Sequence, residues 1–401
     1  MKYNFDKIID RQHTNAMSVE GYREYLFNEG DELNIPCEEK DLIRMWVADM
    51  AFPTAPEIID CIKERVEHGI FGYSKVFNPK YLEAFSNWTE SRYGWKFNKE
   101  HLVHSQGIVP ALYKLIEFLC KPKGKVLIMT PSYAFFKHAV DHNEVELITS
   151  DLIYKEGHYV MDFKDLQQKT ADTDIVLSIL CNPHNPTGRV WTAKELKQFG
   201  EICLANEVSI ISDEIHCDLL RAEQQFTPLA KLFPDSDQII TCMSPSKTFN
   251  MAGFMFSNLI IPNDKLREKW QEDYFGVENP LSITAAQAAY TYGMEWLKEV
   301  SIYIDNNFDF LQQYLSKHLP KVQFTISEAT YLAWINLDAY FSKEENLTLF
   351  FANHAGVLLE GGNMFVSNSD GFIRLNLACP KSILEEGLKR ITQAIITRNR
   401  I

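Results

Sequence analysis

Residues 238–247, QIITCMSPSK, join a short run of strand-forming apolar residues to a polar turn that holds one lysine, Lys247. The run is apolar throughout rather than alternating, which is typical of a strand buried on both faces of a mainly parallel sheet. Pro245 and Gly253 frame the turn with residues that interrupt regular structure. Most lysines keep their ammonium in water at the surface, so the rest of the chain must show whether Lys247 differs.

Similar apolar runs recur between residues 100 and 262 and are separated by helix-like segments. One such segment covers residues 192–207 and begins at Thr192, a residue type that often caps helix N-termini. Alternating strands and helices predict an α/β domain with a mainly parallel sheet between helical layers. The expected strands are 125–130, 145–150, 174–182, 208–214, 238–244 and 257–262.

The second part of the chain predicts a smaller α+β domain, since 401 residues exceed the size at which one core normally keeps growing. Residues 282–319 predict a long helix, bent or broken, that leads out of the sheet domain. We therefore expect an N-terminal segment, 1–48, that joins the small domain, a large domain over 49–290 and a small domain over 291–401. Within the small domain the expected elements are strands at 322–326, 331–337 and 372–377 and a helix from about 382.

Composition narrows the class of protein. The net charge of −14 argues against a nucleic-acid partner or an anionic membrane surface. No apolar run approaches the 18 or so residues of a membrane span, and residues 1–22 lack the apolar stretch of a secretory signal. Eight cysteines without a CxxC pair predict free thiols in a reducing compartment, so cytoplasm is the expected location.

Three of the predicted strands end in polar motifs. CNPHNPTG covers residues 181–188, SDEIHCD covers 212–218 and MSPSK covers 243–247. Functional groups of open α/β sheets gather where loops leave the carboxyl ends of the strands. We therefore expect the three motifs to converge on one crevice.

The second motif allows several readings. Asp213 stands close to Glu214, His216, Cys217 and Asp218, which suggests a metal site, but no second ligand cluster with recognised spacing supports one. No metal is predicted. Asp213 is then either a local capping residue or a buried carboxylate paired with a positive charge, such as a protonated ring nitrogen.

Lys247 and Asp213 together indicate pyridoxal-phosphate chemistry. A lysine amine forms a Schiff base with a carbonyl cofactor, and a carboxylate holds the ring nitrogen of pyridoxal phosphate protonated. The Ser244 and Ser246 hydroxyls stand beside the lysine and suit a phosphate. A second phosphate donor set lies in residues 104–120, where a glycine enters a predicted helix. The expected donors are the backbone N–H groups around Gly107, Ile108 and Val109.

In their order and spacing, these motifs resemble the fold-type I pyridoxal-phosphate enzymes of the class I and II aminotransferase group. The resemblance implies a large domain with a seven-stranded type of sheet and a homodimer. It also implies site roles: Asn185 and Asp213 on the cofactor ring, Lys247 as its covalent anchor, Tyr133 stacked on the ring, Arg374 on the substrate carboxylate, and Tyr73 reaching the phosphate of the neighbouring subunit.

The reaction is implied by a narrower resemblance. MWVADMAF at 45–52, NPHNPTGRVW at 182–191 and SPSKTFNMAG at 244–253 are similar to the cystalysin-like cystathionine β-lyases, although Ala51 stands where that family often has a carboxylate. That family eliminates a thiol from L-cystathionine or related L-cysteine S-conjugates and leaves pyruvate and ammonia. By the same likeness, His216 is expected to contact the cofactor, and Ala48 and Asn185 the substrate.

Two alternatives stay open at the same site. An aminotransferase would use the same residues, and periodicity and composition do not separate it from a lyase. A protein that binds the cofactor only for regulation would be expected to lose Lys247, Asp213 or Arg374, and this chain has all three.

Overall fold

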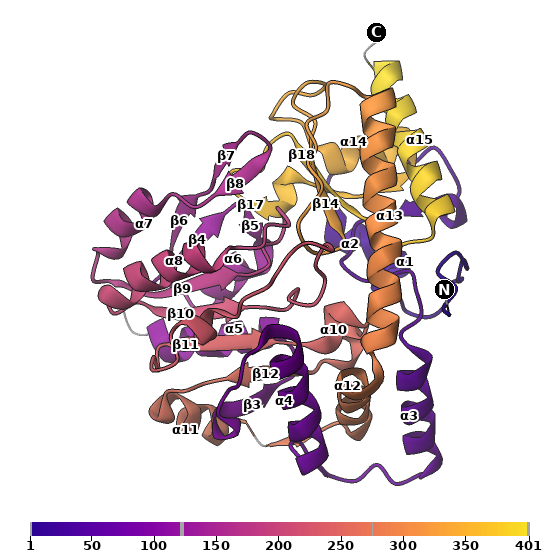
Figure 1. Ribbon diagram of the computed structural model, residues 1–401. Helices are drawn as coiled ribbons and strands as arrows, with labels where there is room; N and C mark the ends of the chain where they lie inside the picture. Colours follow the sequence, from indigo (N-terminus) through magenta and orange to yellow (C-terminus); the bar gives the residue numbers. More distant parts are fainter. Residues whose placement is uncertain (1, 121–123, 275, 399–401) are drawn as a thin grey trace.

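The computed structural model describes residues 2–120, 124–274 and 276–398, and a seven-stranded sheet forms the centre of its larger part (Figure 1). Strand β12 runs antiparallel to both of its neighbours, and the other strands are parallel to one another. The mainly parallel sheet that the sequence predicts is thus confirmed. Across the sheet the strands are β3 (Leu102–Ser105), β12 (Ser257–Ile260), β11 (Ile239–Met243), β10 (Ser209–Asp213), β9 (Ile175–Cys181), β4 (Lys125–Thr130) and β6 (Glu146–Asp151).

One strand, β3, was not among those expected from the sequence. It is only four residues long, and two of its residues, His104 and Ser105, are polar, so it lacks an apolar run. This segment pairs along its length with β12, and Ser105 is opposite Ser257 in the register. Sheet pairing, rather than local composition, makes this segment a strand.

Helices cover both faces of the sheet. Apolar side chains of α5 (Ile108–Cys120), α6 (Ala134–His142) and α11 (Asp264–Asp273) pack against one face. Those of α7 (Phe163–Thr170), α8 (Ala193–Ala205) and α9 (Leu229–Leu232) pack against the other. Thr192 caps α8 as predicted, in a capping box with Glu195.

The predicted long helix is two helices, α12 (Pro280–Tyr292) and α13 (Met294–His318), separated at Gly293. A Cβ atom at Gly293 would lie 2.2 Å from the Phe249 ring, so the break is packed too tightly for a side chain. Helix α12 packs against α3 (Pro56–Glu67) and α4 (Pro79–Tyr93). Figure 1 shows the orange α13 running beside the yellow α15 (Lys381–Arg398).

A three-stranded sheet organises the C-terminal part. It consists of β14 (Leu332–Asn336), β18 (Phe372–Asn376) and β16 (Glu360–Gly361), with α14 (Leu347–Ala355) and α15 nearby. The strand expected at 322–326 is wrong. Gln323 forms only an isolated bridge to Asn336, and without a continuous partner a segment of strand-like composition does not become a strand.

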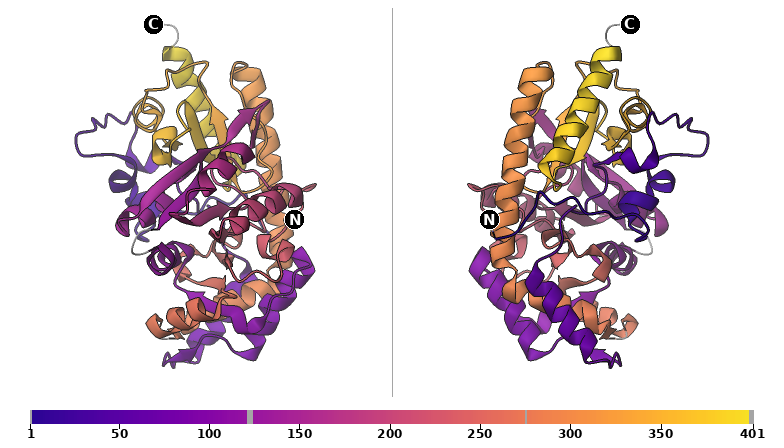
Figure 2. Two further views of the ribbon diagram at one scale, coloured as in Figure 1. Left: turned by 90° about the vertical axis from the view of Figure 1, so that its left-hand side faces the viewer. Right: turned by 90° about the vertical axis from the view of Figure 1, so that its right-hand side faces the viewer.

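The N-terminal segment lies against the small domain. Strand β1 (Ile43–Arg44) pairs in parallel with β15 (Val357–Leu358), and Figure 2 shows the indigo N-terminal chain beside the yellow and orange C-terminal elements. The domain boundaries at residues 48 and 290 stay predictions. The remaining α-helices and strands are α1 (Met17–Glu20), α2 (Tyr22–Leu26), α10 (Pro245–Thr248), and the pairs β2 (Ser74–Lys75) with β13 (Val277–Glu278), β5 (Ser132–Tyr133) with β17 (Phe365–Val366), and β7 (Ile153–Lys155) with β8 (His158–Val160).

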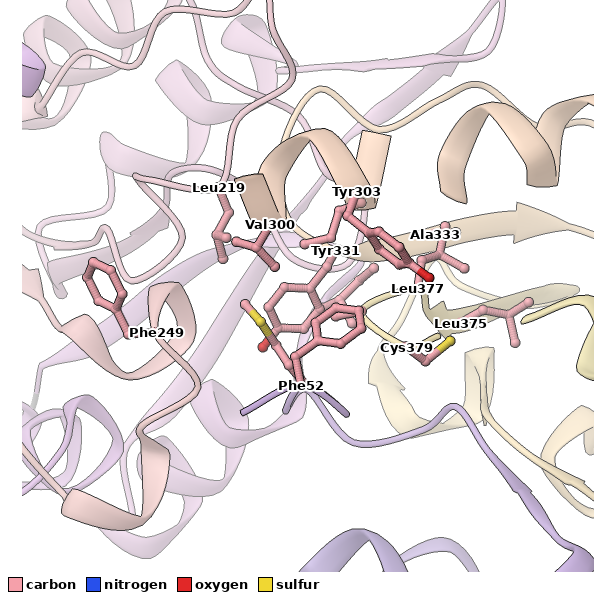
Figure 3. Packing of buried hydrophobic residues seen from close by; sticks show 14 of the residues in the cluster. Phe52, Leu219, Phe249, Val300, Tyr303, Tyr331, Ala333, Leu375, Leu377 and Cys379 are labelled. Atoms are coloured by element: carbon pink, nitrogen blue, oxygen red, sulfur yellow. The ribbon is translucent and has the colours of Figure 1, made fainter. Parts of the chain in front are cut away.

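A buried apolar cluster joins the segments that meet at the sheet edge (Figure 3). It includes Phe52 from the N-terminal segment, Tyr303 from α13, and Tyr331 and Leu377 beside the small sheet. The Tyr331 hydroxyl donates to the backbone oxygen of Ala48 at 2.8 Å. This cluster therefore holds the segment around Ala48 in place. Among the described residues, no helix has the length and apolarity that spanning a membrane requires.

Candidate active site

A cavity opens at the carboxyl ends of β9, β10 and β11, where the large domain, the small domain and the N-terminal segment meet. The register places Asp213 opposite both Cys181 and Cys242, so the three strands end level with one another. Twelve residues predicted from the sequence line this cavity: Ala48, Gly107, Ile108, Val109, Tyr133, Asn185, Asp213, His216, Ser244, Ser246, Lys247 and Arg374.

Lys247 lies in the short helix α10, directly after β11. Ser244 caps this helix by accepting a hydrogen bond from the Ser246 amide at 3.1 Å. The Lys247 ammonium donates to the backbone oxygen of Ala48 at 2.7 Å and has no carboxylate within ion-pairing distance in the described part of the chain. Burial, with the nearby charge of Arg374, lowers the pKa of Lys247 to about 8. The neutral, nucleophilic form of the amine is therefore reached at a lower pH than for an ordinary lysine.

Asp213 ends β10 and is buried. One carboxylate oxygen accepts from the Ile215 amide at 3.2 Å, and no cationic side chain within the described ranges forms an ion pair with it. Burial raises the pKa of Asp213 to about 7, against smaller effects of the Ile215 amide and Lys247. A buried carboxylate is costly without a cation, so the protonated ring nitrogen of pyridoxal phosphate fits this position.

Donors suited to a phosphate occupy another part of the cavity. The Ile108 and Val109 amides belong to the first turn of α5, where backbone N–H groups have no partner within the helix. Gly107 precedes them with φ +108°, a conformation that favours glycine. The Ser257 hydroxyl is buried and has no hydrogen-bond partner among the residues described. Sequence reasoning missed Ser257, which becomes a candidate only through the pairing of β12 with β3.

Arg374 lies at the centre of β18 and is buried. Its Nη1 donates to the side-chain oxygen of Asn185 at 2.9 Å, and its Nη2 donates to the backbone oxygen of Trp46 at 3.3 Å. Glu360, opposite Arg374 in the sheet register, forms an ion pair with its Nη2. Sequence reasoning missed Glu360, because no local motif marks it.

His216 and aromatic side chains complete the cavity wall. Burial, then the charges of Lys247 and Arg374, lower the pKa of His216 to about 3, so its ring is neutral. Its Nδ1 has no hydrogen-bond partner in the described structure. Tyr133 lies in β5 next to Phe365, and burial raises the pKa of its hydroxyl. Sequence reasoning missed Tyr25 and Trp46, which also line the cavity and come from the N-terminal segment.

The other two carboxylates of the SDEIHCD motif have partners outside the cavity. Glu214 accepts from the Ser212 hydroxyl and the Leu229 amide. Asp218 accepts from four side chains, those of Trp88, Arg92, Tyr93 and Thr248. Within the described ranges, no three His, Cys, Asp or Glu side chains are grouped to hold a metal ion.

Tyr73 is the predicted site residue that lies outside the cavity. It directly precedes β2 and is 96% exposed. Ile70 and Phe71 beside it are also exposed. Within one chain Tyr73 therefore contributes nothing to the site, and its predicted role depends on a neighbouring subunit.

Comparisons with known proteins show similarity along nearly the whole chain. The family model for aminotransferase class I and II matches residues 40–391. The cystathionine beta-lyase PatB of Bacillus subtilis is 39% identical over 360 residues, covering 88% of this chain and 93% of PatB. The crystal structure of the PLP-bound C-S lyase from Staphylococcus hominis superposes with a TM-score of 0.94 at 48% identity and covers 98% of each chain.

A more distant structure shows the same architecture. Cystalysin from Treponema denticola, whose crystal structure contains a pyridoxal 5′-phosphate cofactor, is 29% identical with a TM-score of 0.91. The match covers 99% of this chain and all of cystalysin. The similarity thus extends over both domains and the N-terminal segment.

Proposed function

This chain belongs to the class I and II aminotransferase family, and from that membership and the site's geometry we propose that it is a pyridoxal-phosphate-dependent carbon–sulfur β-lyase. Its substrate is L-cystathionine or a related L-cysteine S-conjugate, and its products are a thiol, pyruvate and ammonia. The observation that supports the cofactor is that a half-buried Lys247 and a buried Asp213 line one cavity. The preference for elimination over transamination rests on the lyases among its relatives.

The residues of the site divide the work of this reaction. When bound, pyridoxal phosphate supplies an electron sink for the electrons released at the substrate Cα. Asp213 provides the negative charge that keeps the ring nitrogen protonated. Lys247, with a pKa near 8, takes the proton from Cα and would then donate it to the thiolate that leaves from Cβ, since general bases work best when their pKa is close to the working pH.

We assign to Arg374 the role of binding the substrate carboxylate. A guanidinium matches a carboxylate with two parallel hydrogen bonds. Asn185 and Trp46 hold the guanidinium in position, so its orientation is set before the substrate arrives.

The decisive experiment measures pyruvate from L-cystathionine with purified protein, pyridoxal phosphate and no added keto acid. Steady release supports the lyase. Conversion of amino acids that requires an added keto acid would instead support the aminotransferase. A protein that binds the cofactor and does neither would contradict both enzymes and favour the regulatory alternative.

Cofactor attachment should depend on pH. Below a pKa of about 8 Lys247 is an ammonium without a free electron pair, and above it the amine is neutral. We expect the rate of covalent attachment of pyridoxal phosphate to the cofactor-free protein to rise as pH increases through about 8. Stopped-flow absorbance measures this rate between pH 6 and 9.5. This range extends more than about one pH unit to each side of the pKa. A rate that is flat or falls over this range would contradict the assignment.

We also propose that the chain works as a homodimer in which Tyr73 completes the neighbouring site. Its 96% exposure, together with exposed Ile70 and Phe71, supports an interface there. All eight cysteines are free, which supports a reducing compartment such as the cytoplasm.

A mixing experiment tests the shared site. Tyr73→Ala and Lys247→Ala should each be nearly inactive, because each lacks one part of every site. After subunit exchange in an equal mixture, about a quarter of wild-type activity should return, since half of the dimers then hold one intact site. Tyr292→Ala, which changes another exposed tyrosine, should keep its activity as a control. A mixture that stays inactive although the subunits exchange would contradict the shared site.

A further inference from the structure

The Arg374 guanidinium already faces a carboxylate of this chain. Glu360 and Arg374 are opposite each other in the antiparallel pair β16–β18, so their side chains leave the same face of the sheet. Both are almost fully buried, with side chains 4% and 2% exposed. They form an ion pair inside the cavity that also holds Lys247 and Asp213.

Glu360 occupies the part of Arg374 that an incoming carboxylate would need. Arg374 Nη1 is bound to Asn185, and Nη2 is shared between Trp46 and Glu360. Its Nε has no hydrogen-bond partner in the described ranges. A substrate carboxylate therefore binds a guanidinium that already carries one negative partner. Two carboxylates at one site cannot both stay ionised without a large cost.

We propose that Glu360 is a specificity-determining residue that pairs with Arg374 while the site is empty and takes up one proton from solvent when a substrate carboxylate binds to Arg374. The inference rests on the proposed function, because that function assigns the substrate carboxylate to Arg374. Protonated Glu360 no longer repels the substrate and can still bond to its neighbours through its hydroxyl. Glu360 thereby couples substrate binding to pH.

Four titratable or charged groups face Glu360 from the surrounding elements. Arg374 on β18 and Lys247 on α10 favour its ionised form, as does the Tyr25 hydroxyl on α2. Tyr133 on β5 is the fourth, and burial keeps it neutral. Burial outweighs the cations and raises the pKa of Glu360 above its ordinary value. Burial thus favours the protonated form of Glu360, and a second carboxylate at the same site would favour it further.

Calorimetry can count this proton without turnover. Methylthiopropionate has a carboxylate and a thioether but no amine, so it binds the holoenzyme without reacting. Titrations in two buffers of different ionisation enthalpy should show uptake of about one proton per molecule bound by wild type. Glu360→Gln should show clearly less, which separates Glu360 from any proton taken up near Lys247. Glu360→Asp keeps the charge and should restore the uptake.

Steady-state kinetics give a second readout. At pH 8 Glu360→Gln should lower the KM for L-cystathionine by about tenfold, because it removes a like charge from the carboxylate site. The KM of wild type is expected to rise with pH, and this rise should be weaker in the variant, with little change in kcat. Glu345→Gln removes a carboxylate paired with Arg398 outside the cavity and should leave KM unchanged.

Three results would overturn the inference: no proton uptake by wild type on analogue binding, equal uptake by wild type and Glu360→Gln, or weaker binding in Glu360→Gln. The first needs no variant, so a folding defect in Glu360→Gln leaves the test intact. Failure of the proposed function would show differently, as a wild-type protein that releases no pyruvate.

Discussion

Replacing Lys247 with Ala is expected to abolish pyruvate release from L-cystathionine and to lower kcat/KM by at least about four orders of magnitude, since covalent anchoring and proton transfer both reside on this amine. No other lysine lines the cavity in the described part of the chain, so none is placed to substitute. The variant should still bind pyridoxal phosphate, because Asp213 and the donors at the start of α5 are unchanged.

Borohydride reduction followed by mass spectrometry separates the loss of the anchor from a loss of binding. Wild type should gain the mass of the reduced cofactor at Lys247, and Lys247→Ala should gain none. Lys231→Ala is the matched control, because Lys231 also donates to a backbone oxygen, that of Tyr93, at 2.7 Å but lies outside the cavity. Turnover that survives in Lys247→Ala would show that the anchor has been misassigned.

Asp213→Asn is expected to lower kcat by about two to four orders of magnitude. Removing one partner of a buried charge pair typically costs about 3–5 kcal/mol, and each 1.4 kcal/mol or so corresponds to tenfold in rate. An amide has nearly the same shape but brings no negative charge to the ring nitrogen. The bound cofactor should therefore lose much of its capacity to accept electrons, and its affinity should fall.

Glu214→Gln is the control for this variant. Glu214 is the next residue, is also buried and directs its carboxyl group to Ser212 and Leu229 rather than into the cavity. Burial raises its pKa to about 8, so at pH 7 it is mostly protonated and an amide replaces it closely. Steady-state pyruvate release should fall in Asp213→Asn and change little in Glu214→Gln. Equal activity in the two variants would contradict the role of Asp213.

The coupling inferred at Glu360 bears on substrate choice. Because Arg374 already has a carboxylate partner, the choice among ligands depends on the contacts that their other groups make. Tyr25, Trp46 and Tyr133 present aromatic surface in the same cavity. Apolar contacts made by the sulfur substituent would then supply affinity that the carboxylate alone does not.

Sequence reasoning predicted the sheet and twelve of the residues that line the cavity, because both depend on local patterns. Continuous apolar runs identify buried strands, and parallel strands expose their carboxyl ends at one edge. Asn185, Asp213 and Lys247 each follow such a run, so their convergence follows from the sheet itself. Their chemical roles stay predictions until the variants are measured.

Local patterns failed where pairing between distant segments decides the outcome. Strand β3 is too short and polar to be recognised without β12, and residues 322–326 alternate apolar and polar side chains as a strand would but lack a continuous partner. Ser257 becomes a candidate phosphate donor only beside β3.

What the sequence alone determined about this protein is the α/β sheet and the set of polar residues at its strand ends, because apolar periodicity and strand direction are properties of short segments. Only the tertiary structure decided what Arg374 meets. Glu360 reaches it from the paired strand β16 through sheet register, and Trp46 reaches it from the distant N-terminal segment through domain packing. The charge balance of the carboxylate site is therefore a property of the assembled fold, since electrostatic partners are chosen by distance in space and not by distance along the sequence.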